Sequence, residues 1–151
     1  MIIKSLEHLK LFSVKIAKEL SKSDNIFLFG EIGVGKTTFT RCLINYLQKR
    51  DKIKITDVLS PTFNLLYEYD LKNFKLMHYD LYRIKNIKEI QQLDIFDENK
   101  ETVNIIEWPE LIKGQAENRI ELKFNHEKNI HERKIEIRKY GKWEKFEFNE
   151  F

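Results

Sequence analysis

The sequence predicts one α/β domain, residues 1–151, in which helices flank a mixed β-sheet. Three observations predict it. A phosphate-binding motif stands between a buried strand and a helix, as in parallel α/β sheets. The last third of the chain alternates apolar and polar residues, as antiparallel strands do. The length of 151 residues suits a single domain, and no linker or internal repeat divides it.

The composition is that of a soluble, globular protein, with 42% hydrophobic and 34% charged residues. No apolar run approaches the roughly 18–20 residues of a membrane span, and the N-terminus has no signal-peptide pattern. Cys42 is the single cysteine, and we expect it to be a packing residue. These features predict a cytoplasmic protein without a membrane partner. The net charge of +3 is too small to argue for nucleic-acid binding.

The chain is expected to begin with a helix followed by a strand. Residues 6–20 carry an apolar stripe at helical spacing, and Ser5 is the expected N-cap. Residues 21–25 form a short polar loop. The apolar run Ile26–Phe29 then predicts a buried strand.

Residues 30–37 follow this strand and fit the pattern G-x-x-x-x-G-K-[ST] without a misfit. The glycines let the backbone turn tightly and bring its N–H groups against phosphate oxygens. Lys36 is expected to reach the β- and γ-phosphates, and the Thr37 hydroxyl is expected to ligate Mg²⁺. Apolar residues from Phe39 to Leu47 predict a helix, whose N-terminus adds partial positive charge. This segment predicts a nucleoside-triphosphate site.

A hydroxyl cluster and a hairpin are expected next. Ser60 and Thr62 flank a proline just before a β-rich run, residues 63–69. Residues 70–73 read as a turn and residues 74–79 as the returning strand. The two hydroxyls are compatible with ordinary turn chemistry or with a role at the phosphate site.

The second conspicuous cluster begins at the end of this hairpin. Strand alternation puts His78 and Asp80 on one face and Tyr79 on the other. A carboxylate at a strand end can orient water or hold a metal ion near phosphate. Arg83 can contact phosphate or a partner, or pair with an acidic neighbour.

A helix over residues 86–96, capped by Asn86, is predicted from its apolar spacing, and residues 97–102 read as a polar loop. Asn99 and Lys100 begin like the guanine-reading Asn-Lys-x-Asp motif, but Thr102 stands in place of the aspartate. ATP is therefore favoured over GTP.

The mostly apolar run from Val103 predicts a strand that ends in the carboxylate of Glu107. An acid at the tip of such a strand helps to hold Mg²⁺ in phosphate-binding loop proteins, although the usual residue is aspartate. Pro109 ends the strand. Trp108 is compatible with a core or a lid position. We expect this strand to lie adjacent, or nearly so, to the strand that begins at Ile26.

The last third of the chain predicts antiparallel strands. Apolar residues alternate with charged ones over residues 120–124, 135–137 and 143–148, and Gly141 is the expected hairpin turn before the last run. The charges read as a solvated face.

Taken in order, the phosphate loop, Ser60-Pro61-Thr62-Phe63, His78-Tyr79-Asp80-Leu81-Tyr82-Arg83 and Glu107-Trp108-Pro109 make the chain resemble the TsaE family, also called YjeE. These are small bacterial ATPases of about this length. The resemblance implies a role in making N6-threonylcarbamoyladenosine at position 37 of tRNAs that read codons beginning with A. It also implies work with the TsaB–TsaD heterodimer, which carries the transfer chemistry and through which tRNA is met indirectly.

The resemblance implies a role for each matching residue. Lys36 neutralises phosphate charge, Thr37 and Glu107 hold Mg²⁺, and Asp80 serves hydrolysis as a metal-shell ligand or a water-orienting base. Ser60 and Thr62 belong to a switch-like loop, and Trp108 sits beside the site. The implied ATP-binding residues are Glu31, Ile32, Gly33, Val34, Gly35, Lys36, Thr37 and Thr38. A weak intrinsic ATPase is expected, which the partners complete.

One departure from the family pattern and two rival functions remain. The helix before residue 97 commonly ends with a Leu-Gly pair in relatives, whereas this chain has Leu93-Asp94. The main rival function is a small nucleoside or nucleotide kinase, which needs an arginine-rich lid. The arginines after Glu107 are instead spread along predicted strands. A nucleotide-gated binding module with negligible turnover is a further alternative.

Overall fold

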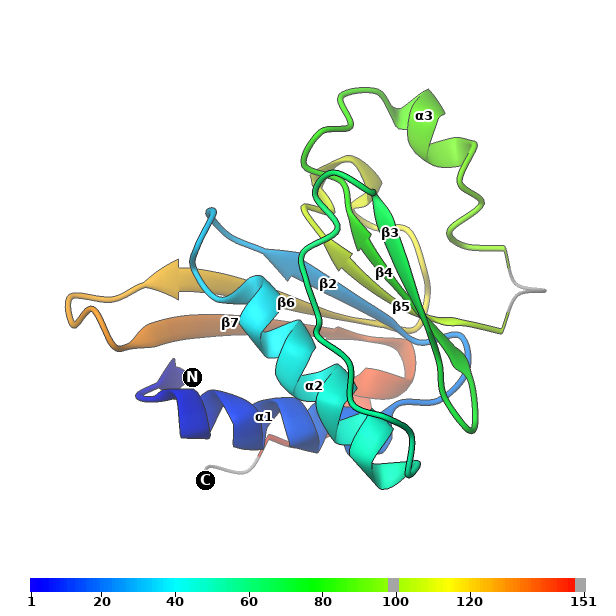
Figure 1. Cartoon of the computed structure of the whole chain (residues 1–151). Coiled ribbons are helices and arrows are strands. Elements are labelled where there is room, and N and C mark those ends of the chain that lie inside the picture. The colour runs from blue at the N-terminus through cyan, green and yellow to red at the C-terminus, as the bar shows by residue number, and fades with distance from the viewer. Residues whose placement is uncertain (98–100, 149–151) are drawn as a thin grey trace.

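The computed structural model describes residues 1–97 and 101–148. Its strands form one seven-stranded sheet, and α1 and α2 lie together on one face of it, whereas α3 stands apart from them (Figure 1). The elements are β1 Ile2–Ile3, α1 Leu6–Glu19, β2 Asn25–Phe29, α2 Lys36–Arg50, β3 Leu66–Asp70, β4 Lys75–Asp80, α3 Ile87–Gln91, β5 Val103–Glu107, β6 Arg119–His126 and β7 Arg133–Tyr140, with 3-10 helices at Glu110–Ile112 and Gly141–Lys145.

The sheet has the order β1-β7-β6-β2-β5-β4-β3. Strands β6, β2, β5 and β4 run parallel, while β3, β7 and β1 pair antiparallel with their neighbours. This confirms the predicted α/β fold with a mixed sheet. The strand of Ile26 lies beside the strand of Val103, as predicted, with Leu28 opposite Glu107. Strand β6, however, joins the parallel part, and the C-terminal antiparallel pairing begins only with β7.

The larger apolar cluster lies between the sheet and the helix pair. Its centre is a chain of aromatic rings: Phe12 of α1 lies 5.8 Å from Phe39 of α2, which lies 5.9 Å from Phe124 of β6. All three side chains are buried. Because Phe39 stands only three residues after Lys36, this packing fixes the start of α2 against the sheet. Cys42, on the same helix, is half-buried, and burial raises the pKa of its thiol.

Replacing Phe12 with alanine is expected to lower the free energy of unfolding by about 3–5 kcal/mol, because a large buried ring leaves a cavity. The ring is fully buried, between Phe39 and Phe148 at 5.8 and 5.5 Å. Urea unfolding measures the change. The neighbouring Leu11 is 48% exposed, so Leu11→Ala is the matched control and should stay within about 0.5 kcal/mol of the unmodified protein. Equal losses in the two variants would contradict this description of the core.

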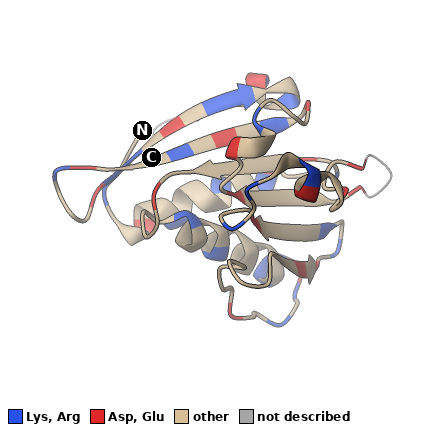
Figure 2. Cartoon of the chain, turned by 90° about the horizontal axis from the view of Figure 1, so that it is seen from above, with Lys and Arg blue, Asp and Glu red and all other residues tan. Residues whose placement is uncertain are grey.

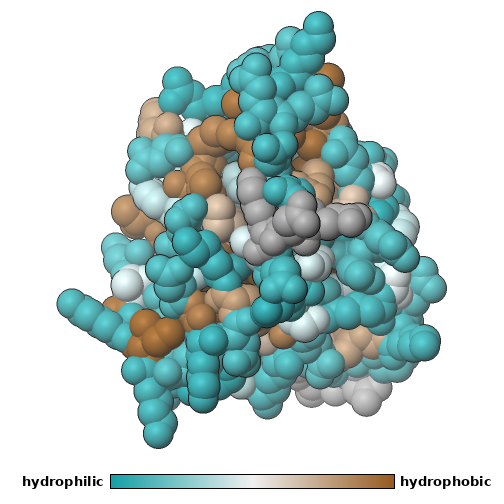
Figure 3. Space-filling view, turned by 90° about the vertical axis from the view of Figure 1, so that its right-hand side faces the viewer, coloured by the Kyte–Doolittle hydropathy of each residue, from teal (hydrophilic) through white to brown (hydrophobic). Residues whose placement is uncertain are grey.

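The second apolar cluster lies on the opposite face, where β2, β4 and β5 meet the segment around α3. Phe27, Tyr79 and Ile106 come from the sheet, and Ile90 comes from α3. Figure 3 views the molecule from the right-hand side of Figure 1, and hydrophobic atoms are visible between hydrophilic ones in its upper half. The helix on this face, α3, has 5 residues, against 14 in α1 and 15 in α2.

The two predicted helix caps are confirmed, but one helix is shorter than expected. The Ser5 side chain accepts a hydrogen bond from the His8 N–H, and the Asn86 side chain accepts one from Lys88 N–H. The helix predicted over residues 86–96 is α3, Ile87–Gln91, followed by turns. Asp94 has φ +47, a left-handed conformation that glycine adopts easily and that ends a helix.

The predicted hairpin is confirmed as β3 and β4, although β3 begins at Leu66 because residues 62–64 form a turn.

The strand predicted over residues 143–148 is wrong. Residues Gly141–Lys145 form a 3-10 helix, and the rings of Trp143, Phe146 and Phe148 pack edge to face against one another. The edge strand β1 was not predicted, because two residues carry no periodicity.

Charged residues of both signs alternate along β6 and β7, as Figure 2 shows. Glu121 stands opposite Arg138, and Lys123 stands opposite Glu136.

Asn99 and Lys100, the start of the guanine-like motif, lie outside the described residues. Within the described ranges, no helix has the length and apolar character needed to cross a membrane.

Candidate phosphate-binding site

The loop between β2 and α2 has the backbone of a phosphate cradle. Gly30 has φ +130, and a Cβ there would lie 2.5 Å from the Phe124 carbonyl oxygen, so only glycine fits. The Val34 N–H donates to the Glu31 carbonyl at 3.3 Å, which closes the turn. From β7, Arg133 Nε donates to the Val34 carbonyl at 3.1 Å. Strands β6 and β7, which lie on the same side of β2, thus hold the loop.

Lys36 is folded back into this loop. Its Nζ donates to the carbonyls of Gly30 and Glu31 at 2.5 and 2.9 Å, and it lies 4.2 Å from the centre of the Trp108 ring. The side chain is buried, which lowers the pKa of the amine, while the carboxylates of Glu107, Asp80 and Glu110 oppose that shift. The ammonium group is therefore desolvated and available to an anion that enters the loop.

Thr37 and Glu107 meet at the tips of α2 and β5. Thr37 Oγ1 donates to the carboxylate oxygens of Glu107 at 3.0 and 3.2 Å. Glu107 is buried, and its Oε1 also lies 2.9 Å from His78 Nε2. The parallel pairing of β2 with β5 produces this contact, since it brings the carboxyl end of β5 beside the loop that follows β2.

Asp80 is held by the loop that contains the hydroxyl cluster. Its Oδ2 accepts hydrogen bonds from Ser60 Oγ at 3.0 Å and from Thr62 Oγ1 at 2.9 Å. Its Oδ1 accepts one from the Tyr82 N–H at 2.9 Å. The Asp80 N–H, in turn, donates to the Leu65 carbonyl at 3.1 Å. The hydroxyls therefore do more than shape a turn: they bind the carboxylate at the end of β4.

Trp108 lies at the mouth of the site in an uncommon backbone conformation. Its φ is +58, which is strained for a bulky residue. Trp108 is half-buried, and the centre of its ring lies 4.8 Å from that of Tyr82. The ring also contacts the Lys36 ammonium group. Trp108 is therefore a wall of the site rather than part of the apolar core.

Most of the predicted site residues line one cavity of about 260 Å³. The predicted site residues that line this cavity are Ile32, Gly33, Gly35, Lys36, Thr37, Thr38, Ser60, Thr62, Asp80, Glu107 and Trp108. Glu31 and Val34 do not line it. The Val34 side chain is buried under the loop, and Glu31 is an exposed residue on the border of a neighbouring cavity.

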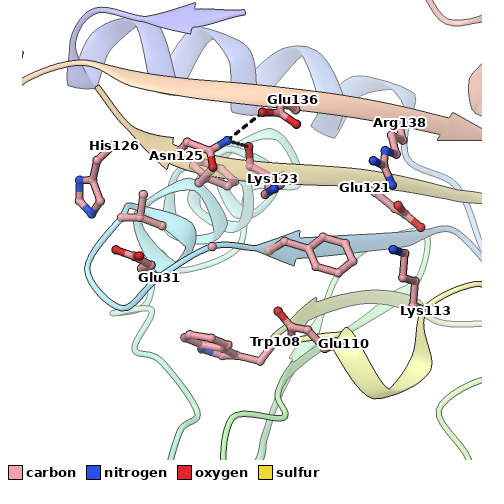
Figure 4. Close-up of a pocket in the computed structure, with 14 residues that line it drawn as sticks. Glu31, Trp108, Glu110, Lys113, Glu121, Lys123, Asn125, His126, Glu136 and Arg138 are labelled. Carbon is pink, nitrogen blue, oxygen red and sulfur yellow. Dashed lines mark hydrogen bonds between the residues drawn. The ribbon is translucent and has the colours of Figure 1, made fainter. Parts of the chain in front are cut away.

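That neighbouring cavity, of about 690 Å³, lies between the Trp108–Lys113 segment and the face of β6 and β7 (Figure 4). Asn125 donates from its amide to Glu136 Oε1 at 3.3 Å and to the Lys123 carbonyl at 3.4 Å. Lys123, Glu136 and Arg138 are exposed, as the predicted solvated face requires, but Glu121 is buried and accepts a hydrogen bond from Arg119 Nε at 2.9 Å.

Two contacts of the site were not predicted. His78 was placed by alternation on the face of Asp80, but its hydrogen bond goes to Glu107 on the next strand. Arg133 carries no sequence signal, because it reaches the phosphate loop only through the position of β7 at the far side of β6.

The donor atoms present suit Mg²⁺. This ion prefers oxygen ligands, binds through one or two protein groups and completes its shell with phosphate and water. The Thr37 hydroxyl and the Glu107 carboxylate, already in contact, supply such a pair. Within the described residues no group of three or more His, Cys, Asp or Glu side chains could hold a metal ion.

Comparison with known proteins identifies relatives with matching sequences. The sequence model of the family "Threonylcarbamoyl adenosine biosynthesis protein TsaE" matches residues 3–135. The TsaE protein of Rickettsia conorii is 39% identical over 111 residues, which are 74% of this chain and 61% of that protein's length. The TsaE protein of Aquifex aeolicus is 33% identical over 126 residues, with 69% of this chain and 92% of the relative covered.

The fold has a solved counterpart as well. The structure described as "Crystal structure of Bacillus subtilus YdiB" superposes with a TM-score of 0.71 at 25% identity, over 95% of this chain and 87% of that one. The family match spans β1 to the start of β7 and so includes the phosphate loop, Asp80, Glu107 and Arg133. The chain belongs to the TsaE family of threonylcarbamoyladenosine biosynthesis proteins.

Proposed function

We propose that this protein binds ATP and hydrolyses it weakly, with Mg²⁺, as an accessory factor in threonylcarbamoyladenosine modification of tRNAs that read codons beginning with A. It acts as one domain in the cytoplasm, with the TsaB–TsaD heterodimer, and meets tRNA indirectly, through that complex. The observation that carries the proposal is the convergence of Lys36, Thr37, Asp80 and Glu107 on one cavity in a chain of the TsaE family.

The phosphate groups of ATP would be bound mainly by charge and by the backbone. Lys36 can exchange its two carbonyl acceptors for phosphate oxygens without leaving the loop, and the N-terminus of α2 adds the donors of its first turn. Thr37 and Glu107 would hold Mg²⁺, which when bound supplies positive charge to the phosphoryl oxygens. Positioning and charge are the main means by which proteins catalyse phosphoryl transfer.

Asp80 is the candidate group for the attacking water. A carboxylate oxygen accepts about two hydrogen bonds, and Oδ2 already accepts two, from Ser60 and Thr62. Only Oδ1 retains capacity while those hydroxyls stay in place. Oδ1 can accept one further hydrogen bond from water, whereas Oδ2 can orient or deprotonate water only after the loop moves. We therefore expect a slow intrinsic reaction. A partner that repositions this loop would accelerate hydrolysis.

Replacing Glu107 with glutamine is expected to lower Mg²⁺-dependent ATP hydrolysis by about two orders of magnitude, because a metal ion contributes several kcal/mol at the transition state. Hydrolysis measured over a range of Mg²⁺ concentrations tests this. Glu110→Gln removes an exposed carboxylate three residues away and is the matched control, which should keep the unmodified Mg²⁺ dependence. An unchanged Mg²⁺ dependence in Glu107→Gln would remove Glu107 from the metal shell.

The proposed role is tested by tRNA modification in a purified system. It contains the TsaB–TsaD pair, the enzyme that forms the carbamoyl-adenylate, bicarbonate, threonine, ATP and tRNA in excess. The yield is compared without this chain, with it, and with its Lys36→Ala form. We expect only the intact chain to raise the yield beyond one round per complex. Equal yields in all three would overturn the proposed role, and a screen of small-molecule phosphate acceptors would then test the kinase alternative.

A further inference from the structure

We propose that His78 is a positioning residue that holds the Glu107 carboxylate in the orientation needed for Mg²⁺. The inference rests on the proposed function, since it assumes that Glu107 binds the metal. His78 itself touches neither the loop nor the cavity of the phosphate site. It therefore acts through another residue, and its role is separate from the roles of Lys36, Thr37 and Asp80.

The geometry of β4 and β5 aims the ring at the carboxylate. His78 stands opposite Ile105, and Glu107 lies two residues farther along the neighbouring strand, on the same face. Side chains on this diagonal can meet when both are long. His78 Nε2 lies 2.9 Å from Glu107 Oε1, and both residues are almost fully buried, at 0% and 2% exposed.

The chemistry of the pair fixes which group donates. A carboxylate only accepts, so His78 Nε2 carries the hydrogen and donates it to Oε1. Thr37 Oγ1 donates to both carboxylate oxygens from the other side. Glu107 is thus held between two donors from two different elements. If the Thr37 hydroxyl oxygen were taken up by Mg²⁺, the His78 hydrogen bond would still hold the carboxylate.

The second ring nitrogen of His78, Nδ1, indicates that the residue is not there for packing alone. Among the described residues, Nδ1 is buried and has no hydrogen-bond partner. A buried polar atom without a partner is unfavourable, and an apolar side chain would fill the same space without that cost. The hydrogen bond to Glu107 is the interaction that distinguishes histidine from such a side chain. Packing by itself therefore does not account for His78.

The test measures Mg²⁺ binding separately from catalysis. A fluorescent ADP derivative is titrated onto the protein in EDTA and then at increasing Mg²⁺, which gives the nucleotide affinity and the Mg²⁺ midpoint. His78→Leu keeps the volume but removes the donor, and we expect its Mg²⁺ midpoint to rise about 10–100-fold, as for other partners of metal ligands. Its nucleotide affinity in EDTA should remain that of the unmodified protein.

Two further variants separate positioning from folding. His78→Gln places an amide donor near the position of Nε2 and should restore most of the Mg²⁺ affinity. Met77→Ala removes a buried side chain from the same strand but on the opposite face, so it should lower thermal stability and leave the Mg²⁺ midpoint unchanged. Excess Mg²⁺ should restore hydrolysis in His78→Leu but not in Glu107→Gln.

Each result decides between the inference and the proposed function. If the unmodified protein binds the nucleotide equally with Mg²⁺ and with EDTA, the proposed metal site itself fails. If it responds to Mg²⁺ but His78→Leu has the same midpoint, the inference about His78 is overturned. If Met77→Ala shifts the midpoint as far as His78→Leu does, the effect comes from loss of stability, and the inference is overturned as well.

Discussion

The Lys36→Ala variant is expected to lose ATP affinity by about 100-fold, because each hydrogen bond to a charged group contributes roughly 1.5–3 kcal/mol and tenfold in affinity is about 1.4 kcal/mol. The amine already donates to two acceptors at the start of the loop, and phosphate oxygens would take their place. Equilibrium binding of a fluorescent ATP analogue measures the loss. Retained affinity and wild-type hydrolysis would contradict the phosphate-loop assignment.

Lys113→Ala is the matched control, because Lys113 is exposed and borders the neighbouring cavity rather than the phosphate site. A pH titration adds a second readout. Burial lowers the pKa of Lys36, and the amine is charged only below that pKa. ATP affinity of the unmodified protein should therefore fall as the pH rises through the lowered value. The Lys36→Ala variant should lack that step, whereas Lys113→Ala should keep it.

Asp80→Asn is expected to reduce ATP hydrolysis by about 10²–10⁴-fold, the usual contribution of a positioned acid or base, while ATP affinity changes little. The amide oxygen can still accept from the Tyr82 N–H, and the amide NH2 can donate to the hydroxyls of Ser60 and Thr62, which also accept hydrogen bonds. The charge and the basicity are lost. Single-turnover hydrolysis with saturating enzyme separates this chemical effect from binding.

The control for this variant is Asp70→Asn, at the exposed end of β3, where the carboxylate pairs with the exposed Lys75. It should hydrolyse ATP at the unmodified rate. Normal hydrolysis in Asp80→Asn would remove Asp80 from the reaction. A parallel loss of affinity and rate would assign it to nucleotide binding instead.

Short sequence patterns were sufficient to predict the phosphate loop with its flanking strand and helix, and the hairpin that ends at Asp80. The phosphate loop, its strand and its helix follow from the glycines and the apolar spacing around Lys36. The hairpin before Asp80 follows from alternation and a polar turn. The failure at residues 143–148 has a physical cause: Trp143 and Phe146 are three residues apart, a spacing that suits one turn of 3-10 helix better than a strand.

Contacts between strands distant in sequence could not be predicted, because they depend on strand order. Alternation placed His78 and Asp80 on one face, but only the pairing of β4 with β5 sends the imidazole to Glu107. The hydroxyls of Ser60 and Thr62 likewise read as turn residues until the fold brings them to Asp80. Strand β1 exists only through its pairing with β7.

The position of β6 and β7 has a practical consequence for dividing the chain. The motif residues from Gly30 to Trp108 look like a separable unit, yet β6 pairs with β2 directly and Arg133 supports the Val34 carbonyl. A fragment that stops at Pro109 would keep β5 beside β2 but expose the other edge of β2, and an exposed strand edge invites aggregation. Truncations for expression or crystallisation should therefore retain β7 and also the 3-10 helix that follows it, because Trp143 is buried in the larger apolar cluster.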